Sequence, residues 1–245
     1  MKRAFGLLWM SMACAAAAVA APASDSPLKG LGVSGGSTLS LPMQIALSMT
    51  LMVLLPAAIM SITPFLRITI VLHFLRQALG TQNTPSNQVL IGLAMFLSML
   101  IIQPLATEIY HTAWEPMDQG RLTAGQALDE GAKPLKTFLS RFAREKDVKL
   151  FVEIAKAPAP RNASDLNLTV LIPAYILSEL RTGFQIGAML FLPFLVIDLV
   201  VASVTVSIGM VQLPPVMLSA PFKILLFVLV DGWNLVVGSL VKSFY

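Results

Sequence analysis

Long apolar stretches alternate with short polar turns along most of this chain. From Leu41 onward the sequence is strongly apolar, and no Asp, Glu, Lys or Arg occurs between Lys29 and Arg67. A helix needs roughly 20 apolar residues to cross a bilayer, and four stretches approach or exceed that length. They are residues 41–75, 89–107, 174–210 and 215–240. The pattern predicts an all-α membrane protein with four hydrophobic helical segments.

Prolines and polar turns arrange these segments as two kinked hairpins. Pro56, Pro64 and Pro104 lie inside apolar runs, and each removes a backbone donor and kinks a helix. A polar turn at residues 76–88 joins the first two segments. A proline-broken stretch at residues 207–223 joins the last two.

A charged region separates the two hairpins. Residues 115–165 carry 17 of the 30 charged side chains in the chain, 9 basic and 8 acidic. Apolar residues recur there at helical spacing, at Leu135, Phe138, Leu139 and Phe142. This pattern predicts a small, soluble, mainly helical insertion whose charges form a solvated face.

The first residues have the layout of a secretory signal peptide. Lys2 and Arg3 precede an uncharged apolar run, and small residues follow at the position where cleavage occurs. Cleavage after Ala20 or Ala21 would place the mature N-terminus, and with it the insertion, in a bacterial periplasm. The expected division is a cleaved signal peptide (1–21), a flexible N-terminal segment (22–40), a first hairpin (41–112), a periplasmic-side insertion (113–170) and a second hairpin (171–245).

Composition excludes several classes of protein. With 56% hydrophobic and 12% charged residues, the chain is too apolar for a soluble domain. The net charge of +4 does not indicate nucleic acid, because no segment gathers basic residues without acidic ones. The sole cysteine, Cys14, falls in the signal peptide, and the sequence contains no Walker, GxSxG, HExxH or CxxC motif. We expect neither enzymatic activity nor a metal or cofactor.

Asp198, Lys223 and Asp231 interrupt the last hairpin. A charge at membrane depth costs at least about 2.5–3.5 kcal/mol, so it usually has a partner. If the helices end near Gly209 and restart near Pro215, Asp198 and Lys223 differ in depth by about 4–5 Å, which a lysine stem can span. The sequence therefore predicts an Asp198–Lys223 pair, and the alternative is a proton relay in which Asp198 titrates.

Further residues are candidates for contacts between helices or subunits. Glu179 and Arg181 are two residues apart and do not share a helix face, so each is expected to meet a separate neighbour, across a subunit interface. Gly183 and Gly187 have the small-xxx-small spacing that permits close helix approach.

Arg67, Arg76 and Asp231 complete the interface candidates. We expect Arg67 and Arg76 to flank the first turn, in agreement with the positive-inside tendency of cytoplasmic loops. The second turn carries no Lys or Arg before Lys223.

Four long motifs are similar to those of the FliP family of flagellar biosynthetic proteins. The motifs are LRQALGTQNTPSNQVLIGLAMFL, QALDEGAKPLKTFL, LIPAYILSELRTGFQIGAMLFLPFLVIDLVVASV and LPPVMLSAPFKILLFVLVDGWNLVVGSL, and the resemblance runs over residues 41–245. It implies a core component of the flagellar type III export gate in the bacterial inner membrane. In such a gate about five copies close into a ring with FliR, FliQ packs outside, and FlhB, FlhA and the basal-body MS ring lie nearby. Much of the assembled mass lies toward the periplasm, and unfolded flagellar subunits pass through the centre.

The resemblance also implies that the second turn lines the pore as a gasket of methionines, which are soft enough to seal and to deform. This chain reads Met210, Val211 and Gln212, with Met217 further along, so a single thioether stands where the family has consecutive ones. The alternative is a packed turn with methionine as filler. For the whole chain, the alternative to an export-gate component is a small transporter or channel that acts alone through Asp198.

Overall fold

A computed structural model describes residues 41–81, 83–156, 166–209 and 214–245. The chain divides into two units, residues 1–48 and 49–245. The described residues form helices and turns without a strand, which confirms the all-α prediction. Over these residues three helices are long and apolar enough to cross a membrane, or four if one bent helix pair counts as a span. The predicted signal peptide and flexible segment lie outside the described residues.

The first apolar run forms two helices rather than one. Helix α2 covers Leu41–Ile62 and contains Pro56, and helix α3 covers Phe65–Ala78. Pro64 occupies the N-cap of α3, where its missing N–H leaves no helix bond unmade. No residue in the apolar window of α2 is buried, and a helix that is apolar on every side must be covered by lipid or by protein.

Helix α4 (Asn87–Ile109) returns alongside α3 and completes a hairpin. It continues through a π-helical turn, Tyr110–Trp114, into the short helix α5 (Glu115–Asp118). The Glu115 N–H bonds to the Tyr110 carbonyl five residues back, which defines the π turn. Pro104 lies inside α4.

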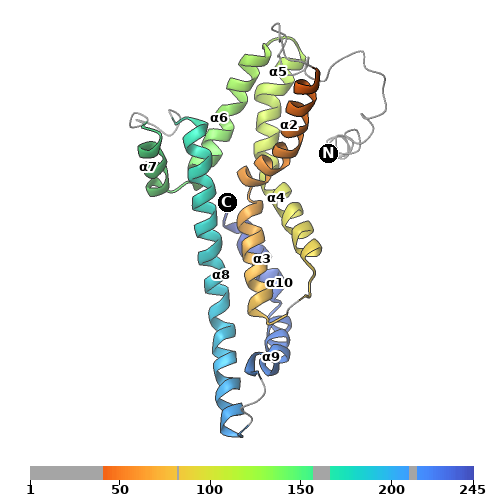
Figure 1. The fold of residues 1–245 in the computed structure, drawn as a ribbon, viewed down its shortest axis with the longest axis vertical. Helices are drawn as coiled ribbons and strands as arrows, with labels where there is room; N and C mark the ends of the chain where they lie inside the picture. The colour runs from red at the N-terminus through yellow and green to blue at the C-terminus, as the bar shows by residue number, and fades with distance from the viewer. Residues whose placement is uncertain (1–40, 82, 157–165, 210–213) are drawn as a thin grey trace, which may run out of the picture. The chain divides into compact units, whose positions relative to one another are not determined.

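The charged region folds into two amphipathic helices, α6 (Ala124–Phe142) and α7 (Glu145–Ile154). A capping box begins α6: the Thr123 hydroxyl accepts from the Gln126 N–H, and the Gln126 side chain accepts from the Thr123 N–H. Both helices pack on the first part of α8, as Figure 1 shows. The apolar cluster between them is built on Leu139, Leu166, Val170, Leu171 and Tyr175.

Helix α8 is the longest element, with 40 residues from Leu168 to Ser207. It begins before residue 171, where we expected the second hairpin to start. Helices α9 (Pro215–Leu229) and α10 (Gly232–Lys242) follow it. Residues 215–240, expected as one apolar segment, form two helices bent by 66°, and together these pass as one candidate span with a break in it.

The bend between α9 and α10 has a local cause. Asp231 adopts the left-handed conformation with φ 51°, which ends the regular helix. A Cβ atom on Gly232 would lie 2.2 Å from the Phe227 ring. The Asp231-Gly232 pair therefore sets the bend, with glycine required by the close approach of the ring.

Helix α3 is the centre of the larger apolar core. It lies between α4 and α8, as Figure 1 shows. Its fully buried residues are Ile68, Val71, Leu72, Leu75 and Ala78. Phe194 of α8, Phe227 of α9 and Leu240 of α10 complete this core.

Candidate functional site

Asp198 and Lys223 are joined in the structure. Lys223 Nζ lies 2.6 Å from Asp198 Oδ2 and 3.0 Å from the carbonyl oxygen of Ala78, to both of which it donates. The Ser219 hydroxyl donates to the other carboxylate oxygen. The Lys223 side chain is 2% exposed and that of Asp198 is 20% exposed. The buried Lys223 ammonium, on α9, therefore links this helix to α8 and to the last residue of α3.

Sequence reasoning did not identify Ser219 or Ala78 as partners. Ser219 stands four residues before Lys223 on α9, so the two share a helix face, and this spacing was an available signal. Ala78 offers a carbonyl at the C-terminal end of α3, where orphan carbonyls and the helix dipole favour a cation. That contact depends on how α3 packs against α9 and has no sequence signal.

A second buried ion pair joins α3 to α8. Arg67 Nε donates to Glu179 Oε2 at 2.8 Å, and Arg67 Nη2 donates to Glu179 Oε1. Arg67 Nη1 donates to Ser243 Oγ at 3.0 Å, and the guanidinium carbon lies 3.9 Å from the centre of the Phe244 ring. A bidentate pair with a stacked ring uses the planar geometry of arginine. Arg67 is 3% exposed and Glu179 is fully buried.

Two expectations for these charges need correction. Arg67 and Glu179 lie inside their own protomer, so they do not present themselves to a neighbouring subunit. Arg67 also does not flank the polar turn at residues 76–88, because it lies near the start of α3, nine residues before Arg76. Arg76 does lie at that turn, where its Nη1 donates to Asn87 Oδ1 at 2.6 Å.

Arg181 and Asp231 are exposed, so their proposed contacts with other subunits stay predictions. Arg181 makes no hydrogen bond or ion pair with any residue that the structure describes. Asp231 accepts a hydrogen bond from the Asn234 amide at 3.1 Å. Both lie in otherwise apolar stretches of the chain.

Gly183 and Gly187 allow α3 to approach α8. A Cβ atom on Gly183 would lie 3.2 Å from Ile70, and one on Gly187 would lie 2.6 Å from the Phe74 ring. The close helix approach expected from their spacing therefore occurs within one chain. Their assignment to a subunit interface is corrected accordingly.

The predicted gasket falls almost wholly outside the described residues. Met210, Val211 and Gln212 are among those that the structure does not describe. Met217 is described: it lies in the first turn of α9 and is 71% exposed. The gasket role stays a prediction.

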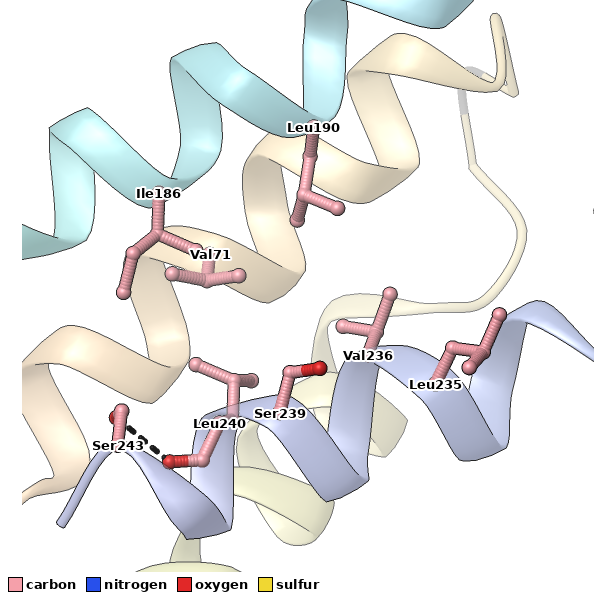
Figure 2. Close-up of a pocket in the computed structure, with 8 residues that line it drawn as sticks. All are labelled: Val71, Ile186, Leu190, Leu235, Val236, Ser239, Leu240 and Ser243. Carbon is pink, nitrogen blue, oxygen red and sulfur yellow. Dashed lines mark hydrogen bonds between the residues drawn. The ribbon is translucent and has the colours of Figure 1, made fainter.

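An apolar cavity of about 330 Å³ lies between α3, α8 and α10. Figure 2 shows Val71, Ile186 and Leu190 on one side of it and α10 on the other. The polar groups in its lining are the hydroxyls of Ser239 and Ser243. Over the described part of the chain, no three His, Cys, Asp or Glu residues gather as metal ligands. The cavity offers packing space rather than a reactive group.

The fold and the paired charges define a helical membrane protein whose two hairpins are joined by the buried Arg67–Glu179 ion pair and by the Lys223–Ala78 hydrogen bond. Comparison with known proteins identifies its family. The sequence profile of the FliP family matches residues 48–240, and the chain belongs to that family.

Relatives named flagellar biosynthetic protein FliP align over most of the chain. The identity is 47% over 211 residues with the protein of Bacillus subtilis (strain 168), covering 86% of this chain and 96% of that one. It is 45% over 212 residues with the protein of Pectobacterium carotovorum subsp. carotovorum, covering 86% and 82%. It is 43% over 234 residues with the protein of Caulobacter vibrioides, covering 96% and 88%.

Proposed function

We propose that this chain is a core pore-forming component of the flagellar type III protein export gate, required for flagellum assembly. The observation that carries the proposal is the 43–47% identity to flagellar biosynthetic proteins over most of the chain. The gate lies in the inner membrane at the flagellar basal body, with much of its mass toward the periplasm. Its role is passage of unfolded subunits rather than catalysis.

The apolar surface of the chain supports assembly with other chains. No residue in the apolar window of α2 is buried, and only 11% of the corresponding window of α8 is buried. Met189 and Leu199 on α8 are each 71% exposed. Apolar surface that extends along whole helices in this way is covered by lipid or by partner proteins. We assign these partners as further copies of the chain, FliR and FliQ, with FlhB, FlhA and the MS ring nearby.

The charges support an anchoring role rather than a solute-carrying one. Both carboxylate oxygens of Asp198 accept hydrogen bonds, from Ser219 and from Lys223. A transporter that works alone through Asp198 would have to break these contacts in each cycle. The ion pair instead joins α8 to α9, and the hydrogen bond from Lys223 to the Ala78 carbonyl holds α9 against α3.

Deletion and complementation test the proposal. The gene that encodes this chain is deleted in the motile, flagellated bacterium that carries it. The deletion strain then receives the chain on a plasmid, and the matched control receives the empty plasmid. Swimming and the amount of flagellar subunits in the medium are measured in both. The proposal expects loss of both in the control and their return with the chain. Normal swimming and secretion in the deletion strain would contradict it.

A further inference from the structure

Two arginines meet on one face of α8. The Arg144 N–H donates to Ser178 Oγ at 2.9 Å, and Arg144 Nη2 donates to Gln185 Oε1 at 2.6 Å. The Arg144 side chain therefore lies along α8 from Ser178 to Gln185. Arg181 follows Ser178 by three residues and precedes Gln185 by four, so it shares their face of the helix. The two guanidiniums thus flank one short, exposed stretch of α8.

The carboxylates near this stretch have other partners. Asp147 is buried and accepts a hydrogen bond from a hydroxyl of α8 at 2.6 Å, and Glu179 is bound by Arg67. The exposed Glu145 is followed by the exposed Lys146, so these two charges offset each other. Neither guanidinium on this face of α8 contacts a carboxylate of any residue that the structure describes. The face is therefore positively charged and suits an anion from outside the chain.

An apolar strip continues along the same face of α8, beyond the arginines. Ala188, Leu192, Leu195 and Leu199 all point within about 40° of the direction of Arg181. All four are exposed, Leu192 at 61% and Leu199 at 71%. From Ala188 to Leu199 the strip is about 16 Å long, roughly half the thickness of the hydrocarbon core of a bilayer. Paired cations above an apolar strip of one leaflet's depth match the two parts of a phospholipid.

The arginines lie where the charged insertion ends and the apolar surface begins. Helices α6 and α7 pack on the first part of α8 and leave its second half uncovered by the insertion, as Figure 1 shows. After Arg181, the next Asp, Glu, Lys or Arg on α8 is Asp198. A change of this kind along a membrane helix marks the level of the lipid headgroups, where basic side chains bind phosphate.

Lys242 of α10 lies at the same level. Arg67 donates both to Glu179 of α8 and to Ser243 of α10, so these two acceptors lie at one height. Arg181 comes two residues after Glu179, and Lys242 immediately precedes Ser243. Lys242 is exposed as well. Cations exposed at one level on two helices agree with a headgroup boundary there.

We propose that an anionic phospholipid binds to this face of α8. Its phosphate lies between the guanidiniums of Arg144 and Arg181, whose planar donors suit phosphate oxygens. One acyl chain lies along the strip that ends at Leu199. The hydrogen bond to Gln185 holds the Arg144 side chain in place before the lipid binds, which lowers the entropic cost of binding. The proposal goes beyond the proposed function, because it concerns the lipid around the chain and not the exported protein.

Lipid titration of the purified gate tests the site. The full chain is purified in mild detergent with the gate proteins that accompany it, and native mass spectrometry measures the phospholipid bound. Phosphatidylglycerol is expected to bind to each copy of the chain. Phosphatidylcholine with the same acyl chains is expected to bind about tenfold more weakly, because its choline opposes the guanidiniums. Equal binding of the two lipids, or binding of inorganic phosphate as tight as that of phosphatidylglycerol, would overturn the proposal.

Glutamine variants locate the phosphate. Arg144→Gln and Arg181→Gln are each expected to weaken phosphatidylglycerol binding about tenfold, because each removes charge-assisted hydrogen bonds to the phosphate. Arg121→Gln is the matched control, since it removes an exposed arginine of the insertion with the same change of charge. It should leave the affinity unchanged. Equal weakening by Arg121→Gln would indicate general charge attraction and would contradict a site on α8.

An asparagine variant tests the acyl strip. Leu192→Asn is expected to weaken phosphatidylglycerol binding while the chain accumulates normally, because the side chain is exposed in the protomer. Leu229→Asn on α9, where the leucine is 73% exposed, is the control and should bind the lipid normally. Equal binding by the two variants would contradict an acyl chain on α8.

The other possible occupant of the arginine pair is a carboxylate of a neighbouring protein chain. In that case the double variant Arg144→Gln, Arg181→Gln would lose its higher oligomers on a native gel, and the unaltered gate would carry no phosphatidylglycerol. That outcome would refute the lipid site and leave the proposed function standing. The proposed function itself fails only if the deletion strain swims and exports normally.

Discussion

One ammonium group, that of Lys223, reaches both the carboxylate of Asp198 on α8 and the final carbonyl of α3 at Ala78. The distances are 2.6 Å and 3.0 Å. Three helices therefore depend on a single buried charge. Such a pair stabilises the fold only while both partners are present, since either one alone is a buried, uncompensated charge.

Replacement of Lys223 is expected to destabilise the protomer severely. Lys223→Met leaves the Asp198 carboxylate unpaired, and breaking a buried pair in this way costs about 3–5 kcal/mol. We expect a large loss of protein in membranes, measured by quantitative immunoblotting. Lys242→Met, at an exposed position, is the control and should accumulate normally.

The double variant Asp198→Asn, Lys223→Met separates an anchoring pair from a proton relay. Removing both charges is far less costly than removing one, so accumulation is expected to recover. Under anchoring, secretion of flagellar subunits recovers with it. A double variant that accumulates fully but secretes nothing would indicate that Asp198 titrates during export.

Arg67→Lys is expected to destabilise the protomer despite retaining the charge. Lysine cannot make the bidentate contact with Glu179 or stack on Phe244, and lost bonds to a charged group cost about 1.5–3 kcal/mol. The midpoint of thermal unfolding in detergent measures the effect. Arg181→Lys on the exposed face of α8 is the comparison. Equal midpoints for the two variants would contradict the role assigned to the buried pair.

Much of the helical organisation could be predicted from hydropathy, because long apolar runs and proline-broken turns are local signals. The structure ends α8 at Ser207 and begins α9 at Pro215, close to the positions used to compare the depths of Asp198 and Lys223. The depths of these two residues follow from the sequence because both lie on one hairpin with a short turn.

Other features depend on packing between distant segments. Arg67 and Glu179 are 112 residues apart, and their contact follows from the alignment of α3 along α8. The sequence alone left both as candidates for a subunit interface, whereas the structure pairs them with each other inside one chain. The break between α9 and α10 was missed although Asp231-Gly232 is a turn signal, because the flanking residues are uniformly apolar.

A glycine-to-alanine series tests the close approach of α3 and α8. Gly187→Ala is expected to be the most damaging, by about 1–3 kcal/mol, because its Cβ would lie 2.6 Å from Phe74. Gly183→Ala should be milder, and Gly92→Ala should stabilise by about 0.5–1 kcal/mol through helix propensity. Thermal unfolding in detergent gives the order. A reversed order would refute the packing described for these helices.

Removal of residues 210–212 tests the predicted seal. In cells that retain the other gate proteins, ion conductance across the inner membrane is expected to rise with the deletion and, to a lesser extent, with Met210→Ala. Methionine fills gaps that alanine leaves open. Met43→Ala, in α2, is the control and should not change conductance. Unchanged conductance in an assembled deletion variant would place the seal elsewhere.

The most direct test of the pore-forming role is photo-cross-linking to an export substrate stalled during secretion. A photoreactive residue replaces Met210 in the turn or Leu128 on α6, which is 76% exposed and serves as the control. A pore-lining position 210 is expected to form an adduct with the stalled flagellar subunit, and position 128 is expected to form none. No adduct from position 210 in a gate that holds the stalled substrate would contradict passage of the substrate along this chain.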